Sequence, residues 1–311
     1  MKHPADVRQL GIVTVYLGLV LGMYFVPQMR HVLVFVVACG FAFLTMLVAH
    51  NHLHQGIFRS QRLNNAFRLV LSFCALYPIS TNVPAHNLVH HRFEDDGQLD
   101  WADPTWVDFK WNLLNLLHFP NAIGTIGLAG TKRYLDSRAG RAMRRQYLYE
   151  QIFSLGVSGL LVLWDPFAGL FFLVLPQLFG ARAILRLNLL QHDGCDLRSR
   201  YNHSRNFVGR FANWLMCNNG LHTIHHNRAG LHWSELPRNH ARDIEPNMDP
   251  ALNEPSLLWY LVRTYVFRFG RAASADLGER TRIPGLPDPD ARLREEPSRA
   301  ESEALAAEAA E

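Results

Sequence analysis

Eight of the sixteen histidines in this sequence stand in three closely spaced groups, and a ninth, His192, lies between the second group and the third. His50 and His54 are four residues apart, and two later stretches, HNLVHH at 86–91 and HTIHH at 222–226, hold three histidines each. On a helix, residues three and four apart share a face, so each group directs its rings toward one point. Neutral imidazole is a common metal ligand. The spacing therefore predicts a metal site, with these candidate ligands: His50, His54, His86, His90, His91, His192, His222, His225 and His226.

The number of rings predicts two metal ions. Structural zinc takes four ligands and catalytic zinc usually three, so nine imidazoles suit two ions with four or five nitrogens each. Imidazole binds iron, copper, zinc and nickel, and ligand type alone does not choose among them. A two-metal site beside apolar segments indicates oxidation of a lipid-soluble molecule. We therefore expect iron, because iron can activate oxygen.

The alternative for each group is an ordinary helix cap or hydrogen bond. A single pair spaced HxxxH is weak evidence, whereas three groups just outside apolar segments on one predicted side favour the metal site. His192 ends a further stretch, NLLQH, in which Asn188 precedes it by four residues on the same helix face. His52 points away from the face shared by His50 and His54, and we expect it outside the ligand set.

Four apolar segments are long enough to position these groups at a membrane. Residues 10–27, 32–49, 146–164 and 167–190 can each span the ~30 Å hydrocarbon layer as a helix. A short polar link joins the first two, and Pro166 turns the chain between the last two. The expected fold is an all-α integral membrane bundle of two helical hairpins, with a cytoplasmic helical cap that carries the histidines.

Charge sets the expected orientation and limits the partners. Basic residues flank the spans on one side of this arrangement, and only Arg30 falls on the other, so the histidines and both termini are expected in the cytoplasm. Three lysines against twenty-eight arginines indicate a bacterial chain, hence an inner membrane. The net charge of +4 gives little support to nucleic-acid binding. Residues 1–269 are expected to form the membrane domain, and the charged, proline-containing residues 270–311 a disordered tail.

Other polar residues are candidates for supporting roles. Arg182 and Arg186 lie one turn apart within the fourth apolar segment, where a charge tends to face a cavity or a partner. One of them is expected to orient a polar end of the substrate or a group behind the metal ligands, unless the two snorkel to the interface or pair with an acid. Carboxylates often hold ligand rings from behind. The candidates for that role are Asp95, Asp96, Asp100, Asp103 and Glu235, with a solvated acidic turn as the alternative.

The three groups in order, HxxxH, HxxxHH and HxxHH, resemble the membrane fatty acid desaturase and hydroxylase family. The 31 residues between His54 and His86 and the stretch NLLQH match that family as well, over roughly residues 10–240. The resemblance implies a four-helix membrane bundle with a di-iron centre held by the nine histidines. Asn188 would be a tenth position that reaches the metal through water. The first box is shorter than in the acyl-CoA Δ9 branch, which puts that particular activity in doubt.

The resemblance implies oxygen-dependent desaturation of an acyl chain in a lipid or thioester, with O2 as co-substrate. The fused cytochrome b5 motif HPGG does not occur, so electrons are expected from a separate ferredoxin or cytochrome b5-like donor. A hydroxylase or ketolase that acts on an alkane, sterol or carotenoid is the first alternative. A non-enzymatic metal-handling membrane protein is the second, although a transporter should place its ligands within the spans. A zinc hydrolase is a third.

Overall fold

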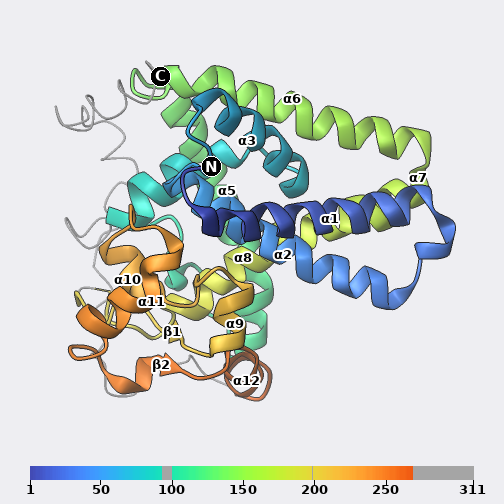
Figure 1. Cartoon of the computed structure of the whole chain (residues 1–311). Coiled ribbons are helices and arrows are strands. Elements are labelled where there is room, and N and C mark those ends of the chain that lie inside the picture. Colours follow the sequence, from blue (N-terminus) through green and yellow to red (C-terminus); the bar gives the residue numbers. More distant parts are fainter. Residues whose placement is uncertain (93–99, 198, 269–311) are drawn as a thin grey trace.

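The computed structural model describes residues 1–92, 100–197 and 199–268 (Figure 1). Helices make up most of this part of the chain, in agreement with the expected all-α class. The exception among the described residues is a parallel pair of two-residue strands, β1 (Asn206–Phe207) and β2 (Asn253–Glu254). The predicted disordered tail, 270–311, lies outside the described residues.

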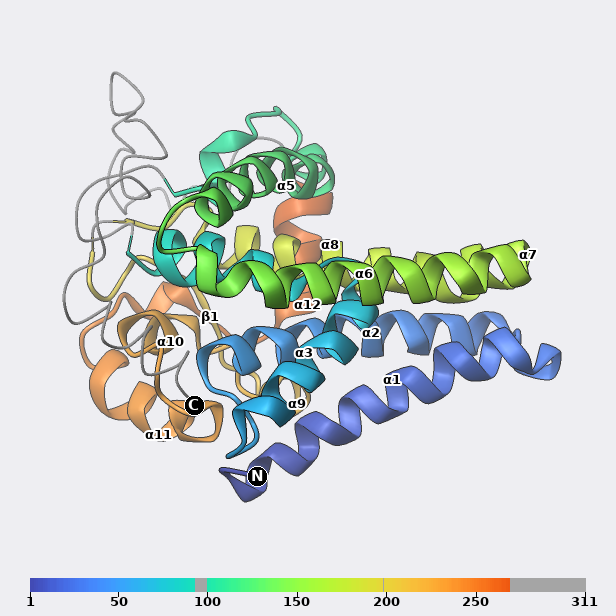
Figure 2. The same cartoon turned by 90° about the horizontal axis from the view of Figure 1, so that it is seen from above.

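Four helices are long and apolar enough to cross a membrane. They are α1 (Val7–Phe25), α2 (Val32–His54), α6 (Arg141–Trp164) and a continuous run of α7 (Pro166–Ala168), the π-helix η7 (Gly169–Val174) and α8 (Leu175–His192). Each matches one of the apolar segments in the sequence. Figures 1 and 2 show them extending together away from the rest of the molecule.

The helices extend beyond the predicted spans at their polar ends. α2 continues past Ala49 and ends only at His54, so the first two histidines stand on the same helix as the apolar segment. α6 begins at Arg141, and α8 ends at His192. At the turn between α6 and α7, the Asp165 carboxylate accepts a hydrogen bond of 3.0 Å from the Ala168 amide. Because α2 and α8 pack along each other, they bring their histidine-bearing ends to the same place.

Two long helices occupy the segment between the second and third spans, and neither was predicted from the sequence. They are α3 (Gln61–Ala75) and the 25-residue α5 (Asn112–Asp136). α5 lies across the bundle near the end at which α2 and α8 carry their histidines (Figures 1 and 2). α3 and the helical residues Ile79–Val89 are bent by 95° to each other, and they would add a fifth span if the pair crossed the membrane together.

Short helices complete the described chain around the strand pair. Three precede α5 after the bend: η3 (Ile79–Thr81), the π-helix η4 (Val83–Val89) and η5 (His90–Arg92). The remaining ones are η1 (Pro4–Asp6), η2 (Pro27–Met29), η6 (Pro104–Trp106), α9 (Arg210–Leu215), α10 (His222–Asn227), η8 (Trp233–Glu235), α11 (Leu236–Asn239), η9 (His240–Ile244), η10 (Pro250–Leu252), α12 (Leu257–Leu261) and η11 (Val262–Val266).

The last described helices pack on the protein and keep an apolar outer face. The Trp111 indole donates a hydrogen bond of 3.0 Å to the Val266 carbonyl, and the buried Tyr265 hydroxyl donates one of 3.0 Å to Asp193. Leu258 and Trp259 of α12 are 71% and 58% exposed. The stretch therefore packs on the protein with one face and exposes apolar side chains on the other.

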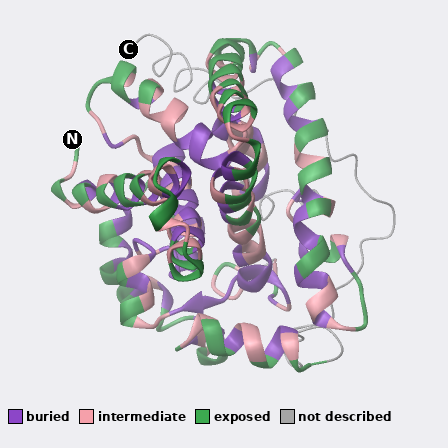
Figure 3. Cartoon of the chain, turned by 90° about the vertical axis from the view of Figure 1, so that its right-hand side faces the viewer, coloured by how far each residue is buried: buried purple, intermediate pink, exposed green. Residues whose placement is uncertain are grey.

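Burial separates the bundle into an inner and an outer surface. In Figure 3 the buried residues gather where the helices meet, and exposed residues cover the outward sides of the long helices. Many of these exposed side chains are large and apolar, among them Val32 at 77%, Leu163 at 80% and Trp164 at 86%. Apolar side chains exposed in such number on long helices are expected where lipid replaces water as the solvent.

Candidate metal centre

The nine predicted histidines come from five helical segments that meet at one place. His50 and His54 lie on the last turns of α2, His86 lies on η4, and His90 and His91 begin η5. α8 contributes its last residue, and α10 contributes the rest. The wide turn of the π-helix η4 is a form that often marks functional sites. Sequence-distant elements thus deliver all nine rings to one centre.

Four of the rings form a first group, made of His50, His54, His86 and His225. One nitrogen from each lies within 4.8 Å of the others. The Nε2 atoms of His50 and His225 are 3.0 Å apart, and those of His54 and His86 are 3.1 Å apart. His225 is buried, and the other three are partly buried. The geometry permits one ion to be bound among these four nitrogens.

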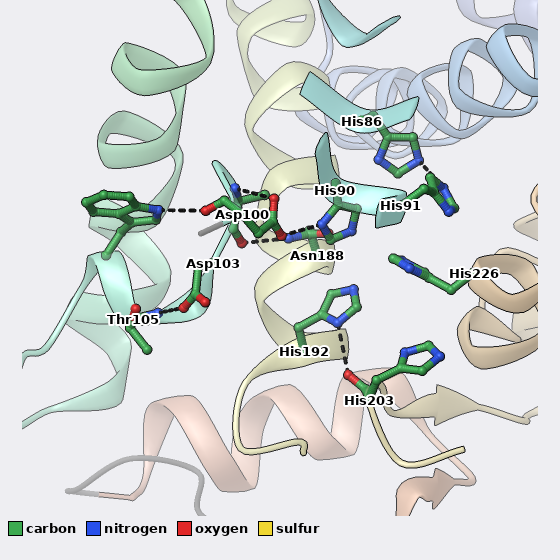
Figure 4. A network of polar contacts seen from close by, with 12 residues as sticks. His86, His90, His91, Asp100, Asp103, Thr105, Asn188, His192, His203 and His226 are labelled. Carbon is green, nitrogen blue, oxygen red and sulfur yellow. Dashed lines mark hydrogen bonds and ion pairs between the residues drawn. The ribbon is translucent and has the colours of Figure 1, made fainter. Parts of the chain in front are cut away.

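A second group consists of His90, His192, His222 and His226, and all four are buried. Their ligand atoms also lie within 4.8 Å of one another. The Nε2 atom of His222 is 2.9 Å from that of His192 and 3.1 Å from that of His226. Figure 4 shows His90, His192 and His226 around a common space. This group can hold a second ion.

His91 lies next to the first group on the side that faces the second. Its Nε2 atom lies 3.0 Å from Nε2 of His86, and its ring centroid is 4.7 Å from that of His54. Its ring also stacks on His226 at 4.3 Å, so it stands between the two groups. Eight of the nine rings therefore form two groups of four, and the ninth, His91, contacts both groups.

Hydrogen bonds from behind the rings test whether the centre fits a metal. The Nδ1 atom of His90 lies 2.5 Å from Oδ2 of Asp100, and Nδ1 of His192 lies 3.1 Å from the carbonyl oxygen of His203. A carboxylate and a carbonyl only accept, so both Nδ1 atoms carry the proton and both Nε2 atoms present lone pairs to the centre. This tautomer is the one that binds metal through Nε2, and an acceptor behind the ring is typical of metal ligands. The donor set fits a metal ion.

Electrostatics favours neutral rings at the centre. Burial, and after it the charges of neighbouring imidazoles, hold the pKa of His222, His225 and His226 well below its usual range. The pKa of His91 is lowered in the same way. A histidine must be unprotonated to bind a metal. The cluster is therefore ready to bind cations at neutral pH rather than to repel them.

Asn188 lies on α8 one turn before His192, close to His90 and Asp100 (Figure 4). Its Nδ2 atom donates a hydrogen bond of 3.2 Å to the carbonyl of Ala102. That bond fixes the amide so that its oxygen remains as the acceptor. The predicted tenth position is therefore placed beside the second group.

The carboxylates proposed from the sequence separate in the structure. Asp100 alone among the described candidates holds a ligand ring. Asp103 instead caps the short helix η6, accepting a hydrogen bond of 2.6 Å from the Thr105 amide, and Glu235 is exposed. Asp95 and Asp96 lie outside the described residues. His52 turns away from the centre, as expected, and its Nε2 atom lies 3.3 Å from the Asn64 carbonyl.

His203 also lies near the centre and is not among the candidates named from the sequence. His203 has no partner at helical spacing, yet its carbonyl fixes His192 and its own ring lies 5.2 Å from that of His226. Its Nε2 atom faces Oδ1 of Asn227 at 3.2 Å. Nothing in the spacing of the sequence could have indicated this contact, because it depends on a loop that returns to the end of α8.

An apolar cavity of about 450 Å³ opens onto both groups. His50 and His86 line it from the first group, and His90 and His222 from the second. The rest of its wall is mostly aliphatic and aromatic, from α2, α5, α6 and α8 and from the segment between α3 and η4. A cavity of this kind can hold an elongated apolar molecule with one carbon close to both groups.

Comparison with known proteins gives one match. Residues 27–256 match the family model described as fatty acid desaturase, which covers well over half of the 311 residues. The matched region begins after α1 and ends just before α12, so it contains every histidine of the two groups. No curated protein and no solved structure matches the chain.

Proposed function

Because the chain belongs to the fatty acid desaturase family, we propose that it is an O2-dependent oxidoreductase that introduces a double bond into the acyl chain of a lipid or thioester. Family membership supports a desaturase-like oxidase in general. The double bond, the acyl substrate and the use of O2 are our proposal. The observation that carries it is the apolar cavity that reaches both histidine groups.

We propose that the two groups bind two iron ions, which would supply the redox chemistry that activates oxygen. The first group, with His91, would offer five nitrogens, and the second would offer four. Asn188, beside the second group, would complete that shell through a water molecule. The remaining tasks belong to the protein. Asp100 and the His203 carbonyl hold two ligand rings in the binding tautomer, and the cavity wall excludes water and orients the chain.

The same proposal includes the setting of the enzyme. Residues 1–269 would form one membrane domain in a bacterial inner membrane, with the histidine centre and both termini on the cytoplasmic side. A separate ferredoxin or cytochrome b5-like protein would supply the electrons. The proposed function involves no nucleic acid. A metal transporter is disfavoured, because the histidines gather at the ends of α2 and α8 rather than within the spans.

Lipid mass spectrometry tests the reaction. A host that expresses the protein should accumulate acyl chains that lack two hydrogens, and the His90→Ala variant should not form them. His118→Ala is the matched control, because His118 is exposed on α5 and belongs to neither group. Hydroxylated chains in place of unsaturated ones would show that the protein is a hydroxylase. A small displacement of the reacting carbon is enough to favour that reaction. Unchanged lipids would overturn the proposal.

A further inference from the structure

The cavity has a mouth on the outer surface of the bundle. Three helices, α5, α6 and α8, contribute lining residues that are also exposed. Leu128 of α5 is 59% exposed, and Leu155 of α6 is 48% exposed. Asn121 and Gly124 of α5 are exposed as well. The cavity therefore reaches the outside between these helices, and does not end inside the protein.

This mouth faces the bilayer side of the molecule. α6 and the run that ends in α8 are two of the four helices suited to cross a membrane. Leu155 lies fourteen residues into α6, well within that helix. Large apolar side chains exposed on such helices face hydrocarbon rather than water. A molecule that enters here comes from the bilayer.

Two glycines line the cavity near its mouth, with open space beside them. Gly124 and Gly127 line the cavity from α5, and a Cβ added at either would meet no atom within 4 Å. Glycine inside a helix costs about 1 kcal/mol relative to alanine. No close packing in the structure requires this cost at the two positions. A chain that passes the rim would occupy the open space next to these two glycines.

An arginine stands at the rim. Arg182 of α8 lines the cavity and is exposed, and within the described residues its guanidinium has no hydrogen bond or ion pair. Arg186, one turn further on, is held differently, because its Nε atom donates a hydrogen bond of 3.2 Å to the Leu116 carbonyl. A charge at such a position is expected to serve a cavity or a partner. The planar guanidinium matches a carboxylate or a phosphate.

We propose that a single acyl chain enters the cavity laterally from the bilayer, between α5, α6 and α8, and that Arg182 binds its anionic group. The substrate class is thus a membrane-resident lipid with a carboxylate or phosphate near the reacting chain. This inference rests on the proposed function in treating the cavity as the substrate site. Asn188 lies six positions after Arg182, or about 9 Å further along α8. The reacting carbon therefore lies several bonds away from the anionic group.

Photolabelling in phosphatidylcholine nanodiscs tests the inference without any turnover. The probes share one chain with a mid-chain diazirine and differ at the end, which is a carboxylate, a methyl ester or a lysophosphatidate. The anionic probes should label α5 and α8 about tenfold more than the ester, as expected for a charge-assisted hydrogen bond. The stronger of the two anions identifies the natural group. Equal labelling by all three probes would overturn the role of Arg182.

Variants separate the anion site from the mouth. Arg182→Gln should remove the preference for anions, and Arg145→Gln, an exposed arginine of α6 outside the cavity, should keep it. Gly124→Leu should reduce labelling by every probe while the melting temperature is unchanged or higher. Normal labelling in Gly124→Leu would contradict the lateral mouth. Selective labelling without any unsaturated product would support this inference and overturn the proposed function. Unsaturated product without selective labelling would support the proposed function and overturn this inference.

Discussion

The Nδ1 atom of His90 lies 2.5 Å from Oδ2 of Asp100, and both side chains are buried. The second oxygen of Asp100 accepts a hydrogen bond of 2.9 Å from the Ala102 amide, so the carboxylate is held from two sides. In this position Asp100 determines which nitrogen of His90 carries the proton. It thereby acts on the second histidine group without belonging to it.

Asp100→Asn should weaken the second group. The asparagine amide can donate to Nδ1 of His90 and so move the ring proton to Nε2, the atom that faces the centre. Loss of such a partner typically costs 10–100-fold in metal affinity or activity. Iron content and turnover should both fall. Asp103→Asn is the matched control, because asparagine caps helices as well as aspartate does. Normal iron and activity in Asp100→Asn would remove Asp100 from the centre.

The metal content follows from the division of the rings into two groups. Protein purified without oxygen should hold close to two irons per chain by elemental analysis. His54→Ala, in the first group, and His222→Ala, in the second, should each lower this content, because each removes a nitrogen that lies within 4.8 Å of the other three. A single zinc with no iron would contradict the proposed di-iron centre.

Asn188 and His192 are predicted to differ in effect although they share one face of α8. His192 supplies a nitrogen 2.9 Å from Nε2 of His222, so His192→Ala should lose iron and activity together. Asn188 is proposed to act through water, so Asn188→Ala should keep most of its iron and lose activity. Iron content and turnover measured on the same samples decide this. Full activity in His192→Ala would show that His192 is not a ligand.

The spans and the histidine groups were predictable because both are local patterns. An apolar run or an HxxxH spacing can be recognised within a short stretch of sequence. The assignment of rings to groups was not predictable in this way. His50 meets His225, which is 175 residues away. His90 belongs to the second group, whereas the adjacent His91 lies 3.0 Å from His86 of the first. Such pairings depend on how α2, η4 and α10 pack, and spacing contains no information on that.

α5 escaped prediction for a related reason. Its sequence contains Pro120, three glycines and five asparagine or threonine residues, which together obscure a helical apolar pattern. Packing resolves the ambiguity, because Leu116, Phe119 and Ile123 are buried on one face. Asp100 could be named from the sequence only as one of several candidates, because local spacing does not show which carboxylate reaches a histidine. Its contact with His90 depends on the chain that returns after the undescribed residues 93–99.

Glu150 of α6 is predicted to hold the segment with His86, His90 and His91 in place. Its buried carboxylate accepts hydrogen bonds from the Ser80 amide at 2.9 Å, the Ser80 hydroxyl at 2.8 Å and Gln146 at 2.9 Å. Ser80 lies in η3, directly before η4. In Glu150→Gln the new NH2 group would face one of these donors and could not accept its hydrogen bond. A buried donor left without an acceptor lowers the free energy of unfolding by about 1–3 kcal/mol. The melting temperature should fall, and Glu235→Gln, at an exposed carboxylate, should leave it unchanged. An unaltered melting temperature in Glu150→Gln would exclude this role.

The last prediction concerns the contact between Gly130 of α5 and Trp101, a buried residue that lines the cavity. A Cβ at position 130 would lie 2.0 Å from the Trp101 ring, so Gly130→Ala must displace the indole. Trp101 directly follows Asp100, and its displacement should therefore lower both thermal stability and turnover. Gly159→Ala in α6 is the matched control, because its Cβ meets nothing within 4 Å. There the substitution should raise stability by up to about 1 kcal/mol, since alanine favours the helix. Thermal unfolding of the two variants should thus shift in opposite directions, and a shift in the same direction would mean that Gly130 is not required for the position of Trp101.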